Sequence, residues 1–226
     1  MNLTLFFYRS IMSDLSNFYN ALPLPQYRNK YEITSHYYNL NYRLITGKIA
    51  YTSPLPDQIK QFVMENDEVI ALPNLYQNNP IGLLLRPIHT KTFRYFSTMN
   101  IPYGAGINNK PYTSPWVIVE SALDSDFLRQ FYPYVIATMG VTVSNFIQDF
   151  LFQTSPYVIV GFDNDDAGNQ AYKKLCYKYK GRVKRLLSPL SNKDFGDTLE
   201  HLFKHNISQF ELETMMIEAS LKTIQD

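Results

Sequence analysis

The residues whose chemistry stands out are four carboxylates in the second half of the sequence: Glu120, Asp163, Asp165 and Asp194. Glu120 directly follows the apolar run 116–119, and Asp163 directly follows the apolar run 157–162. Carboxylates packed together repel one another unless a cation joins them. A hard divalent ion such as Mg²⁺ typically takes one or two carboxylates together with waters and substrate phosphates. The pattern therefore predicts a magnesium site for phosphate chemistry.

The elements that must position these carboxylates are strands buried on both faces, because the apolar runs show no alternation. The predicted strands are 116–119, 134–137, 157–162 and 183–187, and the predicted helices between them are 122–131, 143–152 and 166–179. This alternation predicts right-handed β-α-β units and a parallel sheet. The carboxyl ends of such strands meet at one edge, where open α/β sheets bind their ligands.

The first half of the chain has a different pattern, with shorter apolar segments and turn residues. We expect helical structure over 2–21, a short helix within 54–67, and antiparallel strands at 68–72, 81–86 and 92–98. Pro111 and Pro115 bracket polar residues just before the first buried strand and mark a domain boundary. The expected division is a basic α+β subdomain (1–113), an α/β domain (114–200) and a C-terminal helical segment (201–226).

Composition limits the possible classes of protein. A hydrophobic content of 45% is ample for a packed core. The single Cys176 excludes a disulfide framework and a four-cysteine zinc site within this chain. No secretory signal and no apolar run of about 18 residues is found, so we expect a cytoplasmic protein with no membrane association.

Charge is distributed unevenly along the chain. Residues 1–113 carry ten Lys and Arg against six Asp and Glu, and residues 114–226 carry eleven against fourteen. The halves therefore have net charges of +4 and −3, which sum to the overall +1. A basic half beside an acidic, metal-collecting half suits a protein that holds a polyanion near bound magnesium, although ordinary surface charge explains the numbers equally well.

Four sequence blocks, taken in order, resemble the Toprim domain of bacterial DnaG-type primases and their phage relatives. They are Glu120 with Asp124, the run Val135-Ile-Ala-Thr-Met-Gly140, the run Asp163-x-Asp165-x-Ala167-Gly168, and Lys193-Asp194. The likeness covers roughly the second half of the chain. It departs from the family at Ser121, where glycine is usual, and at Asp197, which lies three positions after Asp194 rather than two.

The resemblance implies roles for the acidic residues. Glu120, Asp163 and Asp165 would be catalytic, and together with Asp194 they would bind Mg²⁺, with Mn²⁺ as a substitute. Glu120 would act as a metal ligand or as the general base that removes the primer 3′-hydroxyl proton. Independently of the resemblance, we expect Asp166 to start the following helix, where its carboxylate would satisfy free backbone N–H groups and the positive end of the helix dipole. We expect Gly168 to permit a close backbone approach.

Cations elsewhere in the chain are candidates for contacts with nucleotide or template. A loose likeness to the segment that precedes the Toprim domain implies such contacts for Arg86 and for Lys91 or Arg94, and Lys193 is a further candidate phosphate contact. The tyrosine-rich stretch 27–51 would either stack bases of single-stranded nucleic acid or form part of a small core. A dense cationic run, 173–185, is interpreted as a solvated helix face, with a nucleic-acid path as the alternative.

These observations lead to one functional hypothesis and two rivals. The hypothesis is a primase catalytic core that makes short RNA primers on single-stranded DNA from ribonucleoside triphosphates, lacks a zinc-binding domain, is phage-like and works with a replicative helicase. Two-metal nucleotidyl transfer, in which metal ions stabilise the attacking and leaving oxygens, would be its chemistry. The rivals are a Mg²⁺-dependent Toprim nuclease and a non-catalytic replication factor that binds single-stranded DNA or a helicase.

Overall fold

The computed structural model of the chain describes residues 19, 22–23, 42–53, 55–76, 79–90, 92–97, 102–106, 110–188, 194–195 and 197–198. The helical structure expected over 2–21 and the C-terminal helical segment 201–226 lie outside the described residues, apart from Tyr19. Most of the tyrosine-rich stretch and the candidate cations Lys91 and Lys193 lie outside them too. Contacts divide the chain into two compact units, 1–101 and 102–226. A functional division at residue 113 stays a prediction.

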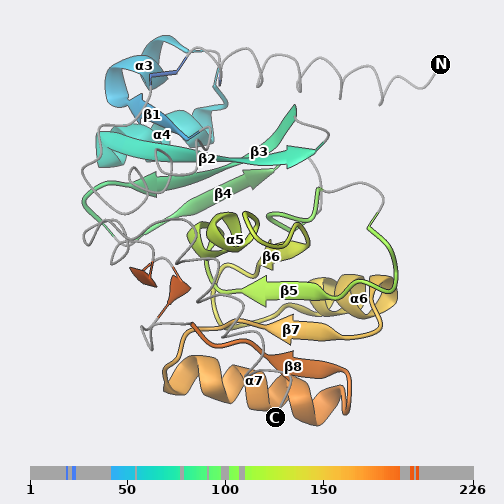
Figure 1. Cartoon of the computed structure of the whole chain (residues 1–226). Coiled ribbons are helices and arrows are strands. Elements are labelled where there is room, and N and C mark those ends of the chain that lie inside the picture. Colours follow the sequence, from blue (N-terminus) through green and yellow to red (C-terminus); the bar gives the residue numbers. More distant parts are fainter. Residues whose placement is uncertain are drawn as a thin grey trace, which may run out of the picture. The chain divides into compact units, whose positions relative to one another are not determined.

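The first unit contains an antiparallel sheet (Figure 1). In its described part, the spatial order β1-β2-β3-β4 is formed by β1 (Arg43–Thr46), β2 (Glu68–Tyr76), β3 (Asn79–Pro87) and β4 (Arg94–Ser97). The helices are α3 (Gly47–Thr52) and α4 (Asp57–Asn66). The expected helix and the three expected strands are therefore present, and β1 and α3 are additional elements.

One face of this sheet forms the core of the first unit. The side chains that gather there come from β2, β3 and α4: Val69, Ala71, Leu83, Leu85, Ile59 and Val63. At Gly82 of β3 a Cβ atom would lie 2.6 Å from the carbonyl oxygen of Phe96 on β4, so this close strand approach requires glycine.

The second unit contains a parallel sheet, as the sequence predicts. Its strands are β5 (Trp116–Val119), β6 (Val135–Ala137), β7 (Val158–Val160) and β8 (Val183–Arg185), in the order β6-β5-β7-β8. The arrowheads of β5, β7 and β8 point to the same end in Figure 1, which places their carboxyl ends at one edge. The expected carboxyl edge therefore exists.

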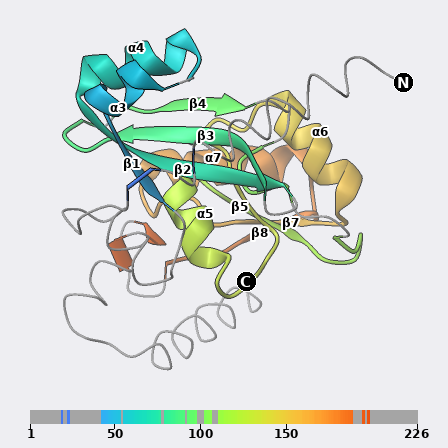
Figure 2. The same ribbon diagram turned by 90° about the horizontal axis from the view of Figure 1, so that it is seen from above.

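Helices α5 (Ala122–Leu128), α6 (Asn145–Thr154) and α7 (Asp166–Lys178) connect these strands. Residues of α6 and α7, including Leu151 and Leu175, share a core with Ile118, Ile136 and Val160 of the sheet. Figure 2 shows α6 and α7 on one side of this sheet and α5 on the other. None of the helices in the described part of the chain is long and apolar enough to cross a membrane.

Trp116 at the start of β5 is the single tryptophan of the chain. Its side chain is 2% exposed and packs against the rings of Tyr134 and Phe150. Its indole N–H donates to the Thr154 hydroxyl oxygen at 2.9 Å. This indole therefore ties the start of β5 to the end of α6.

Candidate metal and phosphate site

Glu120 and Asp163 meet at the carboxyl ends of neighbouring strands. β5 and β7 pair in parallel; Glu120 directly follows β5, and Asp163 follows the end of β7 after Gly161 and Phe162. The Glu120 Oε1 atom accepts a hydrogen bond from the backbone N–H of Asp163 at 2.9 Å. The structure therefore brings these two predicted site residues together.

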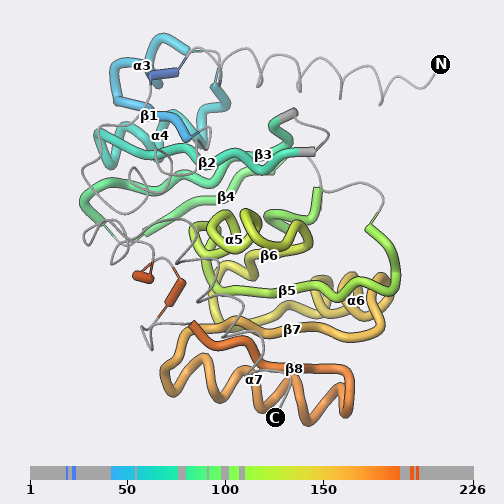
Figure 3. Tube along the Cα trace, viewed as in Figure 1, coloured from blue at the N-terminus to red at the C-terminus, as the bar shows by residue number. Residues whose placement is uncertain are grey.

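Asp165 directly precedes α7, in the connection from β7 to that helix. Figure 3 shows the path of this connection. The Asp165 Oδ1 atom accepts from the backbone N–H of Gly168 at 3.0 Å, which makes Asp165 the N-cap residue. Asp166 is exposed and is the first residue of the helix, as expected, but the hydrogen bond to a free helix N–H that we expected from its carboxylate is made by Asp165. The carboxylate that satisfies the helix N–H groups is thus one residue earlier than predicted.

Gly168 allows the acidic loop to lie against the helix. A Cβ atom here would lie 2.2 Å from the carbonyl oxygen of Asp163 and 3.1 Å from Glu120 Oε1. Any side chain would therefore displace both residues. The expected close approach is present, and the groups it involves are the Asp163 backbone and the Glu120 side chain.

A tight turn after β6 holds the end of β5. Thr138 donates from its backbone N–H and from its hydroxyl to the carbonyl of Val119, and Gly140 donates from its N–H to the carbonyl of Glu120. Met139 has φ of 61° and Gly140 has φ of 125°. A left-handed conformation is uncommon for a non-glycine residue, and strain of this kind is concentrated at functional sites.

Asp194 is connected to the same edge through its neighbour Phe195. The Phe195 ring is 2% exposed, contacts the ring of Phe127, and lies next to Gly161, which follows β7. The Asp194 Oδ1 atom accepts from the backbone N–H of Asp197 at 2.5 Å. Asp197 therefore contributes its backbone to the local turn that contains Asp194.

Arg185 lies at this edge of the sheet, although its sequence neighbours led us to expect it in a solvated cationic run. It ends β8 and pairs with Val160 of β7. Its Nη2 atom donates to the carbonyl oxygens of Phe162 at 3.0 Å and Asp163 at 3.1 Å, and its guanidinium lies over the Tyr172 ring. The signal was available, because a residue at the carboxyl end of a predicted parallel strand belongs to the ligand edge.

The electrostatic surroundings of Arg185 show which carboxylates are near it. Burial has the largest effect and lowers the pKa of the guanidinium below its usual value. The groups that act against this, by raising its pKa, are Tyr172, Glu120, Asp163 and Asp165 in decreasing order. The three predicted catalytic carboxylates therefore lie within electrostatic range of one arginine.

The donor set fits a magnesium ion in kind. Glu120, Asp163 and Asp165 supply oxygen ligands at one edge, and Mg²⁺ typically needs only one or two carboxylates, because waters and phosphates complete its octahedron. Within the described residues, no three His, Cys, Asp or Glu side chains form a ready-made metal cluster. The side chains are therefore of the type that Mg²⁺ binds, but those described do not form a preorganised coordination site.

Among the described candidate cations of the first unit, Arg86 and Arg94 lie on opposite faces of the sheet. Arg94 pairs with Leu85, whose side chain belongs to the core face, and Arg94 lines a hollow with residues of α4. Arg86 follows Leu85 on β3 and so leaves the opposite face of the sheet. Its Nη1 atom donates to the carbonyl of Thr92 at 3.4 Å. The side chains of Arg86 and Arg94 therefore lie on opposite faces of the antiparallel sheet.

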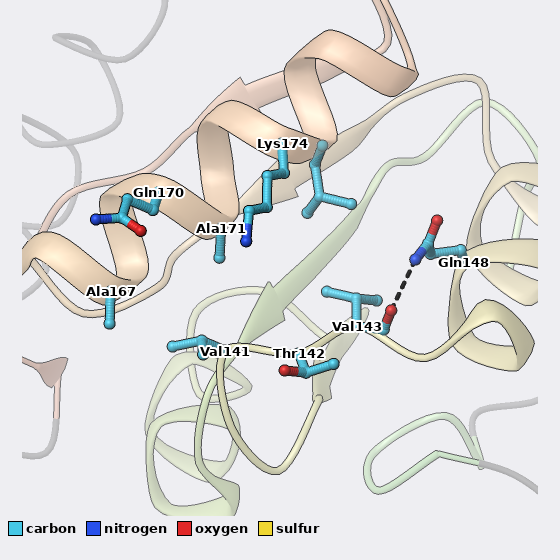
Figure 4. A pocket seen from close by; sticks show the side chains of 9 residues that line it. Val141, Thr142, Val143, Gln148, Ala167, Gln170, Ala171 and Lys174 are labelled. Carbon is cyan, nitrogen blue, oxygen red and sulfur yellow. Dashed lines mark hydrogen bonds between the residues drawn. The ribbon is translucent and has the colours of Figure 1, made fainter.

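A pocket of about 290 Å³ lies between α7 and the loop 141–143 (Figure 4). Ala167 of the acidic run contributes to its wall, and Lys174 extends from α7 toward the loop. Gln148 donates from Nε2 to the carbonyl of Val143 at 2.7 Å and closes one side. Lys174 and its neighbour Lys173 are exposed, as expected for a solvated helix face.

Comparison with a family model decides the nature of the second unit. Residues 117–199 match the model described as Toprim-like. This part of the chain is a Toprim domain. The match starts in β5 and contains the proposed carboxylates Glu120, Asp163, Asp165 and Asp194. Comparison with curated protein sequences gave no match.

Solved structures resemble both the Toprim domain and the unit before it. The Escherichia coli primase catalytic core gives a TM-score of 0.56 at 15% identity, covering 92% of this chain and 80% of that one. The DnaG primase catalytic domain bound to single-stranded DNA gives 0.56 at 16%, covering 94% and 80%. A primase fragment of the bacteriophage T7 primase–helicase gives a TM-score of 0.48 at 16% identity, covering 70% of this chain and 63% of that one.

The fold is therefore that of DnaG catalytic cores, with an antiparallel sheet before a Toprim domain. The chain spans less than two thirds of the T7 fragment. The expected fold class, α/β with a Toprim domain after a smaller α+β unit, is confirmed.

Proposed function

We propose that this chain is the catalytic core of a DNA primase, which makes short RNA primers on single-stranded DNA from ribonucleoside triphosphates. The observation that carries the proposal is the meeting of Glu120, Asp163 and Asp165 at the carboxyl edge of a Toprim sheet. Their setting supports it, because the likeness to primase cores extends over 92% of the chain and includes the unit before the Toprim domain.

In this proposal Glu120, Asp163 and Asp165 are catalytic, and they bind Mg²⁺ or Mn²⁺ together with Asp194. The bound ions would stabilise the attacking and leaving oxygens of nucleotidyl transfer. Glu120 is fixed at the end of β5 by the turn after β6, and this limits the positions its carboxylate can take. A carboxylate fixed in this way is suited to orient a metal ion or to accept the primer hydroxyl proton.

The proposed contacts with nucleotide or template are made by Arg86, Lys91, Arg94 and Lys193. Arg86 and Arg94 leave opposite faces of the first sheet, so we assign them to different ligands or to different parts of one strand. One DnaG structure similar to this chain is bound to single-stranded DNA, which supports that ligand as the template. A replicative helicase is the proposed protein partner, and the cytoplasm, that of the host if the protein is phage-encoded, is the proposed location.

The test is primer synthesis by the purified protein. Single-stranded DNA of mixed sequence, labelled ribonucleotides and Mg²⁺ or Mn²⁺ are incubated with the parent protein and with Glu120→Gln and Asp163→Asn. We expect short products from the parent and a loss of roughly 100-fold or more in each variant, because each removes a carboxylate from the reacting centre.

The matched control is Asp149→Asn, which removes a carboxylate from an exposed position on α6. This variant should retain parental synthesis. Shortening of the DNA without any nucleotide incorporation would replace the primase proposal by a nuclease. Equal synthesis by Asp149→Asn, Glu120→Gln and the parent would show that the assigned carboxylates do not carry the reaction.

A further inference from the structure

Arg182 directly precedes β8 and Arg185 is its last residue. Both side chains donate hydrogen bonds to backbone carbonyl oxygens. Arg182 donates from Nε and Nη2 to the carbonyl oxygens of Phe152, Ser155 and Pro156, at 2.8–2.9 Å. These acceptors end α6, where the helix carbonyls lack partners and a cation is favoured by the helix dipole. The role of the Arg182 side chain is therefore to supply hydrogen bonds to the carbonyl end of α6.

Arg185 also donates to backbone carbonyls, but these bonds leave part of its guanidinium unexplained. Its Nη2 atom lies within hydrogen-bonding distance of three acceptors, the carbonyl oxygens of Phe162 and Asp163 and, at 3.3 Å, Asn169 Oδ1. Its Nη1 atom is buried and has no hydrogen-bond partner among the described residues. A buried donor of this kind is costly unless another interaction compensates for it.

The compensation is the negative potential of the acidic site. Glu120, Asp163 and Asp165 all act on Arg185 in the direction that favours its charged form. The attraction is mutual, so the arginine offsets the repulsion between these carboxylates. Because it also holds the Asp163 carbonyl, it fixes the loop from which two of the three carboxylates project.

We propose that Arg185 is a resident counter-charge of the acidic site, which keeps the carboxylates in place before a divalent cation binds. Arg185 is in this sense a positioning residue. It acts through Glu120 and the Asp163 loop and not on a reacting atom. The proposal rests on the assignment of these carboxylates as the metal site under the proposed function, and it deepens that assignment.

A double-mutant cycle tests the charge interaction without any metal. The parent, Glu120→Gln, Arg185→Met and the double variant are unfolded thermally in EDTA and followed by circular dichroism. Glutamine keeps an oxygen that can accept from the Asp163 N–H and removes only the charge. Methionine is unbranched and of similar length, and it removes the guanidinium.

We expect Arg185→Met to lower the midpoint temperature of thermal unfolding by roughly 5–10 °C, because the carboxylates then lack their counter-charge. Adding Glu120→Gln should raise the midpoint of Arg185→Met, since it relieves repulsion. The same change in the parent should leave the midpoint unchanged or lower it. An identical effect of Glu120→Gln in both backgrounds would overturn the proposal, as would an unchanged midpoint in Arg185→Met.

Arg182→Met is the matched control, because it removes a carbonyl-binding arginine from the other end of the same strand. It should lower the midpoint, and its combination with Glu120→Gln should be additive. Non-additivity of the same size in this pair would show that the coupling is general destabilisation and would overturn the assignment to Arg185.

A second arm repeats the unfolding with Mg²⁺. The ion should raise the midpoint of Arg185→Met more than that of the parent, because it replaces the missing positive charge. A smaller rise in Arg185→Met than in the parent would contradict the counter-charge role. Arg185 would then act only by holding the backbone of the Asp163 loop. If Mg²⁺ raised the unfolding midpoint of none of the proteins, the assignment of a metal site would be contradicted. The double-mutant cycle in EDTA would still show whether Arg185 interacts with the Glu120 charge.

Discussion

Gly168 is the residue at which the acidic site tolerates least change. Replacement by alanine would place a Cβ atom 2.2 Å from the Asp163 carbonyl oxygen, which is backbone and cannot rotate away. We expect Gly168→Ala to lower the free energy of unfolding by about 2–4 kcal/mol, as overpacking against a fixed group does. Urea unfolding followed by circular dichroism measures this loss.

Gly47→Ala is the control for that prediction. Gly47 also begins a helix, but a Cβ atom there would meet the Asp67 side chain at an ordinary 3.7 Å. Alanine should therefore be neutral or stabilise by up to about 1 kcal/mol, because it restricts the unfolded chain. Equal losses at both positions would contradict the steric explanation.

Residue types and spacing predicted the Glu120–Asp163 pair, because both residues follow strands that end at one edge. Residue types and spacing did not predict which hydrogen bonds each acidic side chain makes. Asp165 and Asp166 are identical in type and adjacent in sequence, and only the backbone angle at the helix start decides that Asp165 caps α7. Arg185 was misassigned because it ends a run of cations that begins with exposed lysines on α7, whereas Arg185 itself lies in β8 and is partly buried.

At the scale of elements, the start of α5 explains a departure from the family pattern. Ser121 is the N-cap residue of this helix: its hydroxyl oxygen accepts from the Asp124 N–H at 3.2 Å, and the hydroxyl donates to Asp124 Oδ2 at 2.6 Å. Serine and glycine are both favoured at N-caps. Serine can therefore stand where the resemblance expects glycine without changing the turn after Glu120.

This explanation makes a graded prediction for one position. Ser121→Ala should cost about 1 kcal/mol of the free energy of unfolding, because alanine cannot satisfy the helix N–H group. Ser121→Gly should cost only a few tenths of a kcal/mol in the same comparison. Chemical unfolding of the two variants beside the parent provides the measurement, and a larger loss for glycine than for alanine would contradict the capping role.

The sequence predicted the parallel strands because their apolar runs are unbroken, and it predicted the helices from what lies between those runs. Helix ends were less accurate: α6 begins at Asn145 and not at 143, because Ser144 caps it. β1 and α3 were missed, since the stretch that contains them is rich in tyrosine and its few apolar residues fit either a core or a nucleic-acid surface. Tertiary packing makes that choice, with Ile45 and Ala50 in the core.

At the scale of the whole chain, the two units differ in charge as well as in fold. Residues 1–101 carry nine Lys and Arg against six Asp and Glu, a net charge of +3, and residues 102–226 carry twelve against fourteen, a net charge of −2. If the first unit holds the template, binding of single-stranded DNA should weaken steeply with salt, with a slope of about −0.7 per phosphate contact on a double-logarithmic plot. Filter binding at several KCl concentrations gives this slope.

Arg94→Gln should reduce that slope by about 0.7, because one phosphate contact is lost. Lys48→Gln removes the same charge from an exposed position on α3 in the same unit and should leave the slope unchanged. An equal reduction in both variants would show that the slope reports overall charge and not a contact at Arg94.

The position of Trp116 has a spectroscopic consequence. Because the chain has one tryptophan, and that indole is packed inside the Toprim domain, intrinsic emission excited near the red edge of absorption reports on this domain alone. The tyrosines and peptide groups report on both units. A comparison of the two signals during denaturation therefore separates loss of the domain that carries the carboxylates from loss of the unit that precedes it.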